Sequence, residues 1–410
     1  MRKIACSILA AVALVSIGGC GRATKAKDLM SSIKANSQEI TDIDAGSITP
    51  PVADFSVELL KRCADGQNNV MVSPASVISA LAMTFNGAEE DTLKQFENTV
   101  CGCDIDEFNK FFGNYMRSLT DDRAVTFDNA NAIWIREGLE VKKDFLQKNA
   151  DYYGAGVFTA PFDDSTVKDI NKWVKDNTGG LIEDIVDELN PETVMCLVNA
   201  VYFDAKWEEP YTEEQVRDGD FTDISGNTKK VKMMHSSDTM GYIHGDDVTG
   251  FIKPYEGNYS FVALLPDEDV NVNDFIDGFS GDEFAKLIES KKNATVIASL
   301  PEFSYDYDKS LKDVLMAMGI NDAFGEAADF TGITESENLF ISEVLHKTHI
   351  DVNTDGTKAA AATAVMMDNG CAMIEENEVY YVNLDRPFVY AIVDNNNYLP
   401  VFMGVLYSID

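Results

Sequence analysis

Apolar residues recur along this chain at two spacings, and each spacing predicts a class of secondary structure. Spacings of three and four residues mark one face of a helix. They predict helices over residues 52–63, 74–86 and 168–177. The second of these helices has Ser73 as its N-cap and Pro74 in its first turn, and Gly87 follows its last residue.

Longer apolar stretches predict β-strands, and these are spread along the chain without strict alternation with helices. The predicted strands cover residues 124–136, 193–207, 294–303, 339–353 and 388–406. The last stretch holds a polar turn at residues 395–397 between two apolar runs, which is typical of a hairpin. We find no internal repeat. The pattern favours the α+β class, with several long strands and helices around them.

Composition narrows the class of protein further. The chain has 410 residues and is 45% hydrophobic, which suffices for a large core in a single unit. Lys and Arg total 33 and Asp and Glu total 69, so the net charge is −36. A surface this acidic repels phosphate backbones, which argues against a nucleic-acid partner. The acidic residues are spread along the chain, which indicates a soluble surface, and we expect a monomer.

Cysteines and catalytic motifs point to neither a cofactor nor a metal. Apart from Cys6 and Cys20, the chain has five cysteines, an odd number without a disulfide-framework spacing. Cys101-Gly-Cys103 could form a redox or metal pair, but two thiols alone make a poor zinc site. Cys196 lies in an apolar run and is interpreted as a core residue. We find no HExxH, GxSxG or phosphate-binding loop, and the chain has four His residues.

The N-terminus has the order of a signal peptide. Arg2 and Lys3 precede an apolar run at residues 4–17, and Gly18-Gly19-Cys20 follows. The run is too short to span a membrane comfortably. A pair of small residues directly before a cysteine resembles the bacterial lipoprotein signal, and the alternative is an ordinary cleavage site beside a chance cysteine.

The lipoprotein resemblance implies that residues 1–19 are removed and that Cys20 carries the lipid. The protein would then be an extracellular, cell-surface lipoprotein whose contact with the membrane is that lipid alone. Residues 20–51 contain no aromatic residue and end in Pro50-Pro51, so we interpret them as a tether, partly helical near 28–40.

The most informative stretch lies between residues 341 and 388. It begins as a strand, continues through Gly356 into an alanine-rich run, and then has about two dozen mostly polar residues before Arg386. In an extended chain the residues that share one face are Thr357, Ala359, Ala361 and Thr363, all small and uncharged. Such a face could slide between two strands without overpacking the core. The alternative is a short surface helix, because alanine is the best helix former.

The run GTKAAAATA is similar to the hinge of inhibitory serpins, so this segment resembles the serpin family. Other segments follow the family's order, namely VMVSPASVISALAM, INKWVKDNTGG, LVNAVYFDAKW, FVALLPDE, DFTGIT, LFISEVLHKTHIDVN and RPFVYAIVDNNN. The resemblance implies an inhibitor domain over residues 52–410, with a large central mixed β-sheet, smaller sheets, surrounding helices and an exposed reactive loop near 356–380. The implied hinge is Gly356, Thr357, Lys358, Ala359, Ala360, Ala361, Ala362, Thr363 and Ala364.

The resemblance also implies a mechanism and a partner. In inhibitory serpins a protease cleaves the loop and forms an acyl-enzyme, and the loop then inserts into the central sheet and traps the protease. Counting forward from Gly356 places the cleaved bond between Gly370 and Cys371. Counting back from Pro387 moves it to Met373-Ile374 or Glu376. Small or unbranched residues there favour an elastase-like or subtilisin-like serine protease, with a papain-like cysteine protease as the alternative.

Further residues match the region beneath the point where a serpin sheet opens. They are Ser73, Ser76, Asn199 and His346, and Trp207 matches the tryptophan near the place where the loop enters the sheet. Without the family, His346 is equally well interpreted as a core histidine. It lies three residues from His349, so on a strand the two face opposite sides and metal binding is not expected. Where serpins usually have Glu two residues before the hinge Gly, this chain has Thr354.

Two rival functions remain. A non-inhibitory serpin would act as a binding or chaperone-like module and never insert its loop, but bulky or charged residues on the inward hinge face, which favour that function, are absent. A lipid-anchored enzyme is the second rival. It lacks a recognisable catalytic motif, so the sequence predicts that the protein is not an enzyme.

Overall fold

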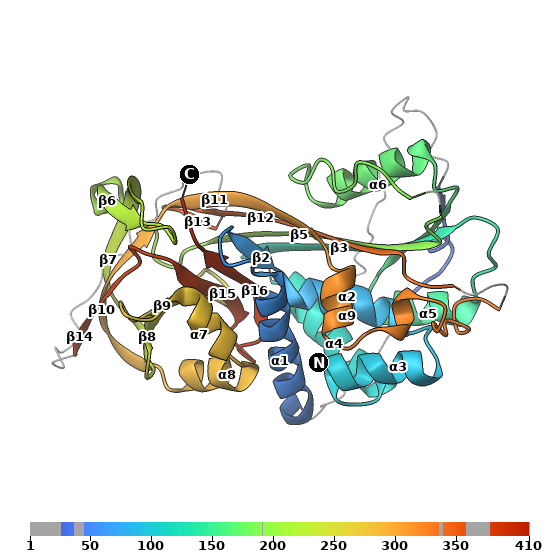
Figure 1. The fold of residues 1–410 in the computed structure, drawn as a ribbon, viewed down its shortest axis with the longest axis horizontal. Coiled ribbons are helices and arrows are strands. Elements are labelled where there is room, and N and C mark those ends of the chain that lie inside the picture. The colour runs from blue at the N-terminus through green and yellow to red at the C-terminus, as the bar shows by residue number, and fades with distance from the viewer. Residues whose placement is uncertain are drawn as a thin grey trace, which may run out of the picture.

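The structure is a computed structural model that describes residues 26–36, 45–122, 124–190, 192–335, 339–357 and 378–409. Its α-helices are α1 (Ala45–Cys63), α2 (Pro74–Phe85), α3 (Glu90–Phe96), α4 (Ile105–Thr120), α5 (Lys143–Tyr152), α6 (Asp164–Asn177), α7 (Val272–Gly278), α8 (Gly281–Glu289) and α9 (Lys312–Ala317). The fold that they form with the strands is shown in Figure 1.

The strands form two sheets in the described residues. The first has the order β1-β4-β3-β5-β13-β12-β11, and its strands are β1 (Lys27–Asp28), β3 (Val125–Arg136), β4 (Gly156–Ala160), β5 (Met195–Lys206), β11 (Phe303–Ser310), β12 (Glu343–Val352) and β13 (Gly356–Thr357). Parallel and antiparallel pairs both occur, because β3 is antiparallel to β5 while β5 is parallel to β12. We call this mixed sheet the central sheet.

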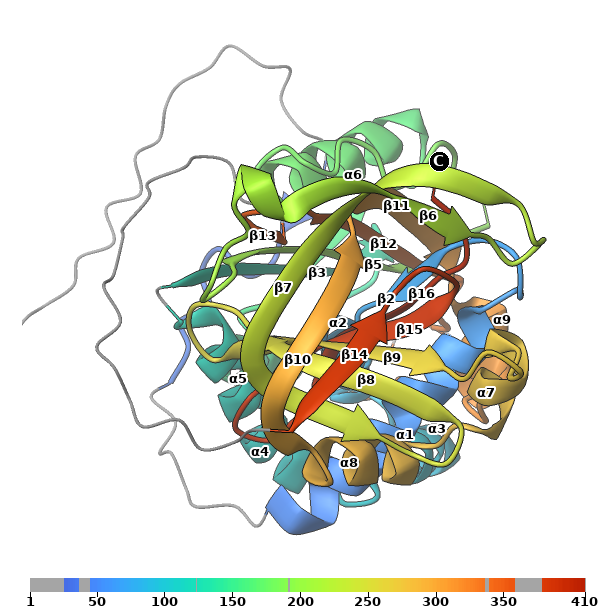
Figure 2. The ribbon, with the colours of Figure 1, turned by 90° about the vertical axis from the view of Figure 1, so that its left-hand side faces the viewer.

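The second sheet has the order β14-β10-β7-β8-β9-β15-β16-β2, with β6 paired to β7. Its strands are β2 (Val70–Val72), β6 (Val216–Thr222), β7 (Thr228–His244), β8 (Val248–Pro254), β9 (Tyr259–Pro266), β10 (Lys292–Pro301), β14 (Val379–Asn383), β15 (Phe388–Asp394) and β16 (Pro400–Leu406). Figure 2 shows β7, β10 and β14 side by side in front of the remainder of the fold. The predicted hairpin of residues 388–406 is β15 and β16.

Helices cover both faces of the central sheet. Figure 1 shows α1, α2, α4 and α9 on one side and α6 on the other. Every residue of α2 is buried, so this helix is enclosed by the core on all of its sides. The main apolar core lies on the α2 side, and a smaller cluster joins Ile170 and Val174 of α6 to Cys196 and Val198 of β5. The α+β class and the large mixed sheet are confirmed, and these layers leave β5 and β12 at the centre of the molecule.

The N-terminal part differs from the sequence prediction in two places. Helix α1 begins at Ala45 instead of residue 52, and it includes Pro50 and Pro51, which the sequence analysis took as the end of a tether. Burial of Ile48 and Val52 against the core holds this first part helical despite the two prolines. The described residues 26–36 contain a short strand that pairs with β4, and no helix.

None of the helices in the described residues combines the length and the apolar character that crossing a bilayer requires.

Candidate functional site at the opening of the central sheet

Strands β5 and β12 are neighbours at one end of their length and separate at the other. They pair directly where Cys196–Val201 of β5 lies beside Glu343–Thr348 of β12. Beyond this segment β13 stands between them, with Thr357 beside Ala205 of β5 and Val352 of β12. The sheet is therefore already open at one end, and the first residues of the predicted hinge occupy the gap.

The two described hinge residues fit closely in this gap. A Cβ atom on Gly356 would lie 2.0 Å from the carbonyl oxygen of Ala205, so a residue with a side chain does not fit there. The Thr357 side chain is buried, and its hydroxyl group lies 2.5 Å from the Tyr255 hydroxyl. Thr357 therefore faces inward. Residues 358–364, the remainder of the hinge, lie outside the described residues.

Trp207 holds the turn that leads into the hinge. Its indole N–H donates to the carbonyl oxygen of Asn353 at 2.9 Å, and its backbone N–H donates to that of Asp355 at 2.9 Å. The ring stacks on Tyr255 at a centroid distance of 4.4 Å. The carbonyl of Thr354, where the sequence departs from the family pattern, accepts from the backbone N–H of Tyr211 at 2.9 Å. That bond depends on backbone atoms, so it does not require Glu at this position.

A buried lysine lies under the same cluster. The Lys253 side chain is 3% exposed, and its ammonium nitrogen is 3.4 Å from a carboxylate oxygen of Asp238. The nitrogen also lies 4.5 Å from the centre of the Tyr211 ring and 5.6 Å from that of Trp207, which are cation–π distances. Burial lowers the pKa of Lys253, while Asp238 opposes this shift. The lysine thus joins the second sheet to the rings beside the hinge.

A polar network lies beneath the closed end of the sheet, where β5 and β12 pair. Asn199 of β5 lies level with His346 of β12, and the two side chains are hydrogen-bonded. The amide group of Asn199 also donates to Ser76 on α2. Ser73, the predicted N-cap of α2, donates through its hydroxyl group to the carbonyl of Val401 at 2.8 Å. These residues, which the resemblance grouped at the sheet opening, lie in one network that links both strands to α2.

The hydrogen bonds of His346 define its tautomer. The backbone N–H of Ser73 donates to Nε2 of His346 at 3.3 Å, so Nε2 is the acceptor. Nδ1 then carries the proton that it donates to Oδ1 of Asn199. The imidazole is fully buried, and this burial lowers its pKa to about 3. His346 is therefore a neutral link between β12, β5 and α2 at ordinary pH.

Sequence reasoning missed three members of this site. Asn131 of β3 accepts from Asn199 at 2.5 Å, and Asn129 accepts from the Ser76 hydroxyl at 2.5 Å. Tyr255, the partner of Thr357, directly follows β8 of the second sheet. A sequence signal existed for the two asparagines, because they are polar residues within the largely apolar strand Val125–Arg136. No such signal marks Tyr255, because an aromatic residue next to a strand is common.

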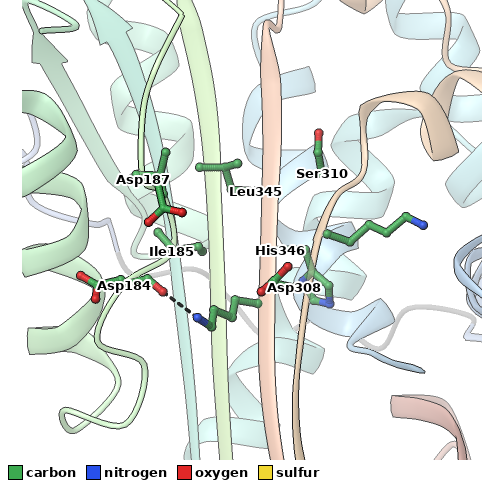
Figure 3. A pocket seen from close by; sticks show the side chains of 10 residues that line it. Asp184, Ile185, Asp187, Asp308, Ser310, Leu345 and His346 are labelled. Carbon is green, nitrogen blue, oxygen red and sulfur yellow. Dashed lines mark hydrogen bonds between the residues drawn. The ribbon is translucent and has the colours of Figure 1, made fainter. Parts of the chain in front are cut away.

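The segment that follows α6 crosses the outer face of β12. A cavity of about 250 Å³ lies between residues 184–187 and strands β11 and β12. Figure 3 shows the side chains that line it. The ammonium group of Lys347 on β12 donates to the carbonyl of Asp184 across this cavity at 2.8 Å. A strand added between β5 and β12 would shift β12 relative to this segment, so the Lys347 contact would have to change.

Other predicted residues are placed as follows. Cys20, Gly370, Cys371, Met373, Ile374 and Glu376 lie outside the described residues, so the lipidation site and the cleaved bond stay predictions. His349 faces away from His346 and its Nδ1 lies 2.7 Å from a carboxylate oxygen of Asp306. Within the described ranges, no cluster of three or more His, Cys, Asp or Glu has the arrangement of a metal site.

Comparisons with known proteins agree with this geometry. The family model described as "Serpin (serine protease inhibitor)" matches residues 51–409. An uncharacterized serpin-like protein of Thermococcus kodakarensis is 30% identical, over 97% of each chain. Iris of the tick Ixodes ricinus is 32% identical, over 87% of this chain and 98% of its own. The chain therefore belongs to the serpin family.

Solved structures give the same result. The native state of tengpin, a thermophilic serpin, is 43% identical with a TM-score of 0.87, over 94% of this chain and all of that one. Human thyroxine-binding globulin, solved with thyroxine, is 26% identical with a TM-score of 0.80, over 88% of this chain and 98% of that one. The fold therefore occurs both in a thermophilic serpin and in a globulin that binds thyroxine.

Proposed function

We propose that this protein is a suicide inhibitor of serine proteases that acts by loop cleavage, acyl-enzyme trapping and insertion of the loop into the central sheet. The observation that carries the proposal is the position of β13 between β5 and β12. The hinge has begun to enter the sheet, and its first inward side chain, Thr357, is buried. The residues that would follow it on the inward face are Ala359, Ala361 and Thr363, which are small and uncharged.

The free energy for trapping would come from the added strand. An inserted strand of about ten residues would gain about ten backbone hydrogen bonds, at a net value of about 1 kcal/mol each. This total is comparable to the stability of a typical domain. The uncleaved protein would persist because a barrier separates it from the inserted form. The Asn199–His346 bond is part of that barrier, because it joins the two strands that must part.

The proposed reaction with the protease is a half-completed hydrolysis. The serine hydroxyl of the protease attacks the carbonyl carbon of Gly370, an ester forms, and the amino group of Cys371 leaves with the proton taken from the serine. Insertion then displaces the protease before water attacks the ester. The alternative bond is Met373-Ile374. Elastase-like and subtilisin-like enzymes are the proposed targets, and a papain-like enzyme would form a thioester in the same way.

The test is a search for a covalent complex. The purified protein is incubated with pancreatic elastase and with subtilisin, and denaturing electrophoresis should show a band at the summed mass. Thr357→Arg should be cleaved without forming the complex, because a guanidinium group cannot be buried beside Tyr255. Thr357→Ser keeps the hydroxyl group and should still form it. If wild type and Thr357→Arg are both merely cleaved, the inhibitory function is wrong and the non-inhibitory binding module takes its place.

We also propose the cellular location. The Gly18-Gly19-Cys20 sequence supports removal of residues 1–19 and lipid attachment at Cys20, which would hold the inhibitor at the outside of the cell. Mass spectrometry of the protein made in a bacterial host should find a diacylglyceryl group on Cys20. Cys20→Ser should move the protein from the membrane fraction to the soluble fraction, and an unmodified Cys20 would contradict the proposal.

A further inference from the structure

Large apolar side chains are almost all buried in the described part of the chain, and two of the exceptions lie on one strand. The exposed ones are Leu181 (37%), Val379 (50%) and Tyr381 (68%), and the last two belong to β14. This strand pairs with β10 on one side, and no described strand pairs with it on the other. Exposed aromatic and branched side chains on an edge strand are typical of a surface that binds a partner.

The strand register extends this surface across three strands. Val379 lies level with Thr295 of β10, which lies level with Thr239 of β7. Tyr381 likewise lies level with Ile297 and, beyond it, Ser237. Residues that are level on neighbouring strands share a face. We call these residues the uncharged patch, and its members are Val379, Tyr381, Thr295, Ile297, Thr239 and Ser237.

The patch stands out against the charge of the molecule. One residue in four is charged, and the net charge is −36, yet no member of the patch is acidic or basic. All six are exposed or half-buried. A partner that covers them would therefore remove apolar and neutral polar groups from water and would not have to desolvate a charge.

The other face of β14 holds the patch in place. Tyr380 stacks on Tyr242 of β7 with ring centres 3.9 Å apart, and Val382 is buried. These contacts fix the strand against β10 and β7. Tyr381 is thus presented on a rigid support, which lowers the entropy that binding would cost.

The position of the patch indicates which partner it binds. The segment 358–377, which carries the cleaved bond in the proposed function, ends two residues before Val379. Nine residues separate Gly370 from Val379, so even a fully extended chain spans at most about 30 Å between them. A protease of roughly 240 residues has a radius of gyration of about 18 Å. A protease attached at Gly370 is therefore large enough to lie against the patch.

We propose that the uncharged patch is a second contact surface for the target protease, engaged while the protease binds the reactive segment. The proposal rests on the proposed function. The surface fits a protease whose rim beside the active-site cleft is apolar and uncharged, with Tyr381 as the main contact, because tyrosine is frequent among the residues that dominate interfaces. Its role is to speed formation of the first complex, before the loop is cut.

The test compares association rate constants for covalent complex formation with elastase or subtilisin, using whichever the wild type inhibits faster. Tyr381→Ser should lower this constant roughly tenfold, while the fraction of encounters that end in a covalent complex stays the same. Leu181→Ser, an exposed apolar residue away from the patch, is the matched control and should change the constant less than twofold. Because the patch is neutral, the ratio of the wild-type constant to the Tyr381→Ser constant should be the same in about 0.05 M and in about 0.5 M sodium chloride.

Three results would overturn the assignment. Equal constants for wild type and Tyr381→Ser, with inhibition intact, would refute the patch and leave the proposed function standing. Absence of any covalent complex with wild type would remove the proposed function and the patch together. A concentration-dependent dimer in sedimentation that Tyr381→Ser abolishes, without any change in inhibition, would show that the patch binds a second copy of this chain.

Discussion

Acidification should weaken the closed central sheet through His346. Burial lowers the pKa of this imidazole to about 3 in the folded protein, whereas an exposed histidine has a pKa near 6.5. Between these values the unfolded chain binds a proton that the folded protein does not. The folded state therefore keeps its full stability above pH 6.5 and loses stability as the pH falls toward 3.

The size of this loss of stability follows from the lowered pKa of His346. Each pH unit below 6.5 removes about 1.4 kcal/mol from the free energy of unfolding, so pH 4.5 costs about 3 kcal/mol. Replacement of His346 by Gln removes this pH-dependent loss of stability. At neutral pH, however, Gln can keep the acceptor for the Ser73 N–H while leaving Asn199 without its donor, which costs about 1–3 kcal/mol.

The assay is urea unfolding of wild type and His346→Gln, followed by circular dichroism, between about pH 7.5 and about pH 4.5, a range that covers the upper half of the window. The variant should be the less stable protein at neutral pH, and the difference should shrink and then reverse on acidification. All other titrating groups are common to both proteins, so the difference isolates His346. His349→Gln, on the opposite face of the same strand, controls for losing a histidine from β12. Parallel curves for wild type and His346→Gln would refute the reasoning.

Three further predictions concern the hinge, the buried lysine and the thiols. Gly356→Ala should withdraw the hinge from the sheet and lower the free energy of unfolding by about 1–3 kcal/mol, because the added Cβ would meet the Ala205 carbonyl. Gly325→Ala, whose added Cβ meets no atom, is the control and should leave the melting temperature unchanged. Lys253→Met should cost about 1–3 kcal/mol, because it leaves the partly exposed Asp238 carboxylate without its partner. Adding Asp238→Asn should restore most of the melting temperature. Burial raises the pKa of the buried thiols, so iodoacetamide at neutral pH should label them in urea but not in the native protein. These thiols are Cys63, Cys101 and Cys196.

The predictable part of the fold is the part that local patterns encode. The cap at Ser73 and the hairpin of β15 and β16 lie where the sequence analysis expected them, because each depends on neighbouring residues. The start of α1 at Ala45 was missed. Pro50 and Pro51 indicated the end of a tether, whereas the burial of Ile48, which supports the helix, is a tertiary contact that leaves no local pattern in the sequence.

The site was only partly predictable for a similar reason. Ser76, Asn199 and His346 were grouped by family resemblance, and no pattern within the sequence pairs residue 199 with residue 346. The gap that holds Thr357 depends on where β5 and β12 part, and that point is a property of the packed sheet. Its partner Tyr255 follows β8, a strand of the other sheet, so only the folded chain brings the two hydroxyl groups together.

The most direct test of the account is the melting temperature before and after the segment 358–377 is cut. Thermolysin suits this cut, because a zinc protease forms no acyl-enzyme and cannot be trapped, and mass spectrometry would locate the cleaved bond. Insertion should stabilise the protein by roughly 10 kcal/mol and raise the melting temperature by on the order of 10 °C. Thr357→Arg, cut in the same way, should gain much less. An unchanged melting temperature in the cut wild type would mean that the hinge stops at Thr357, and it would contradict trapping by insertion.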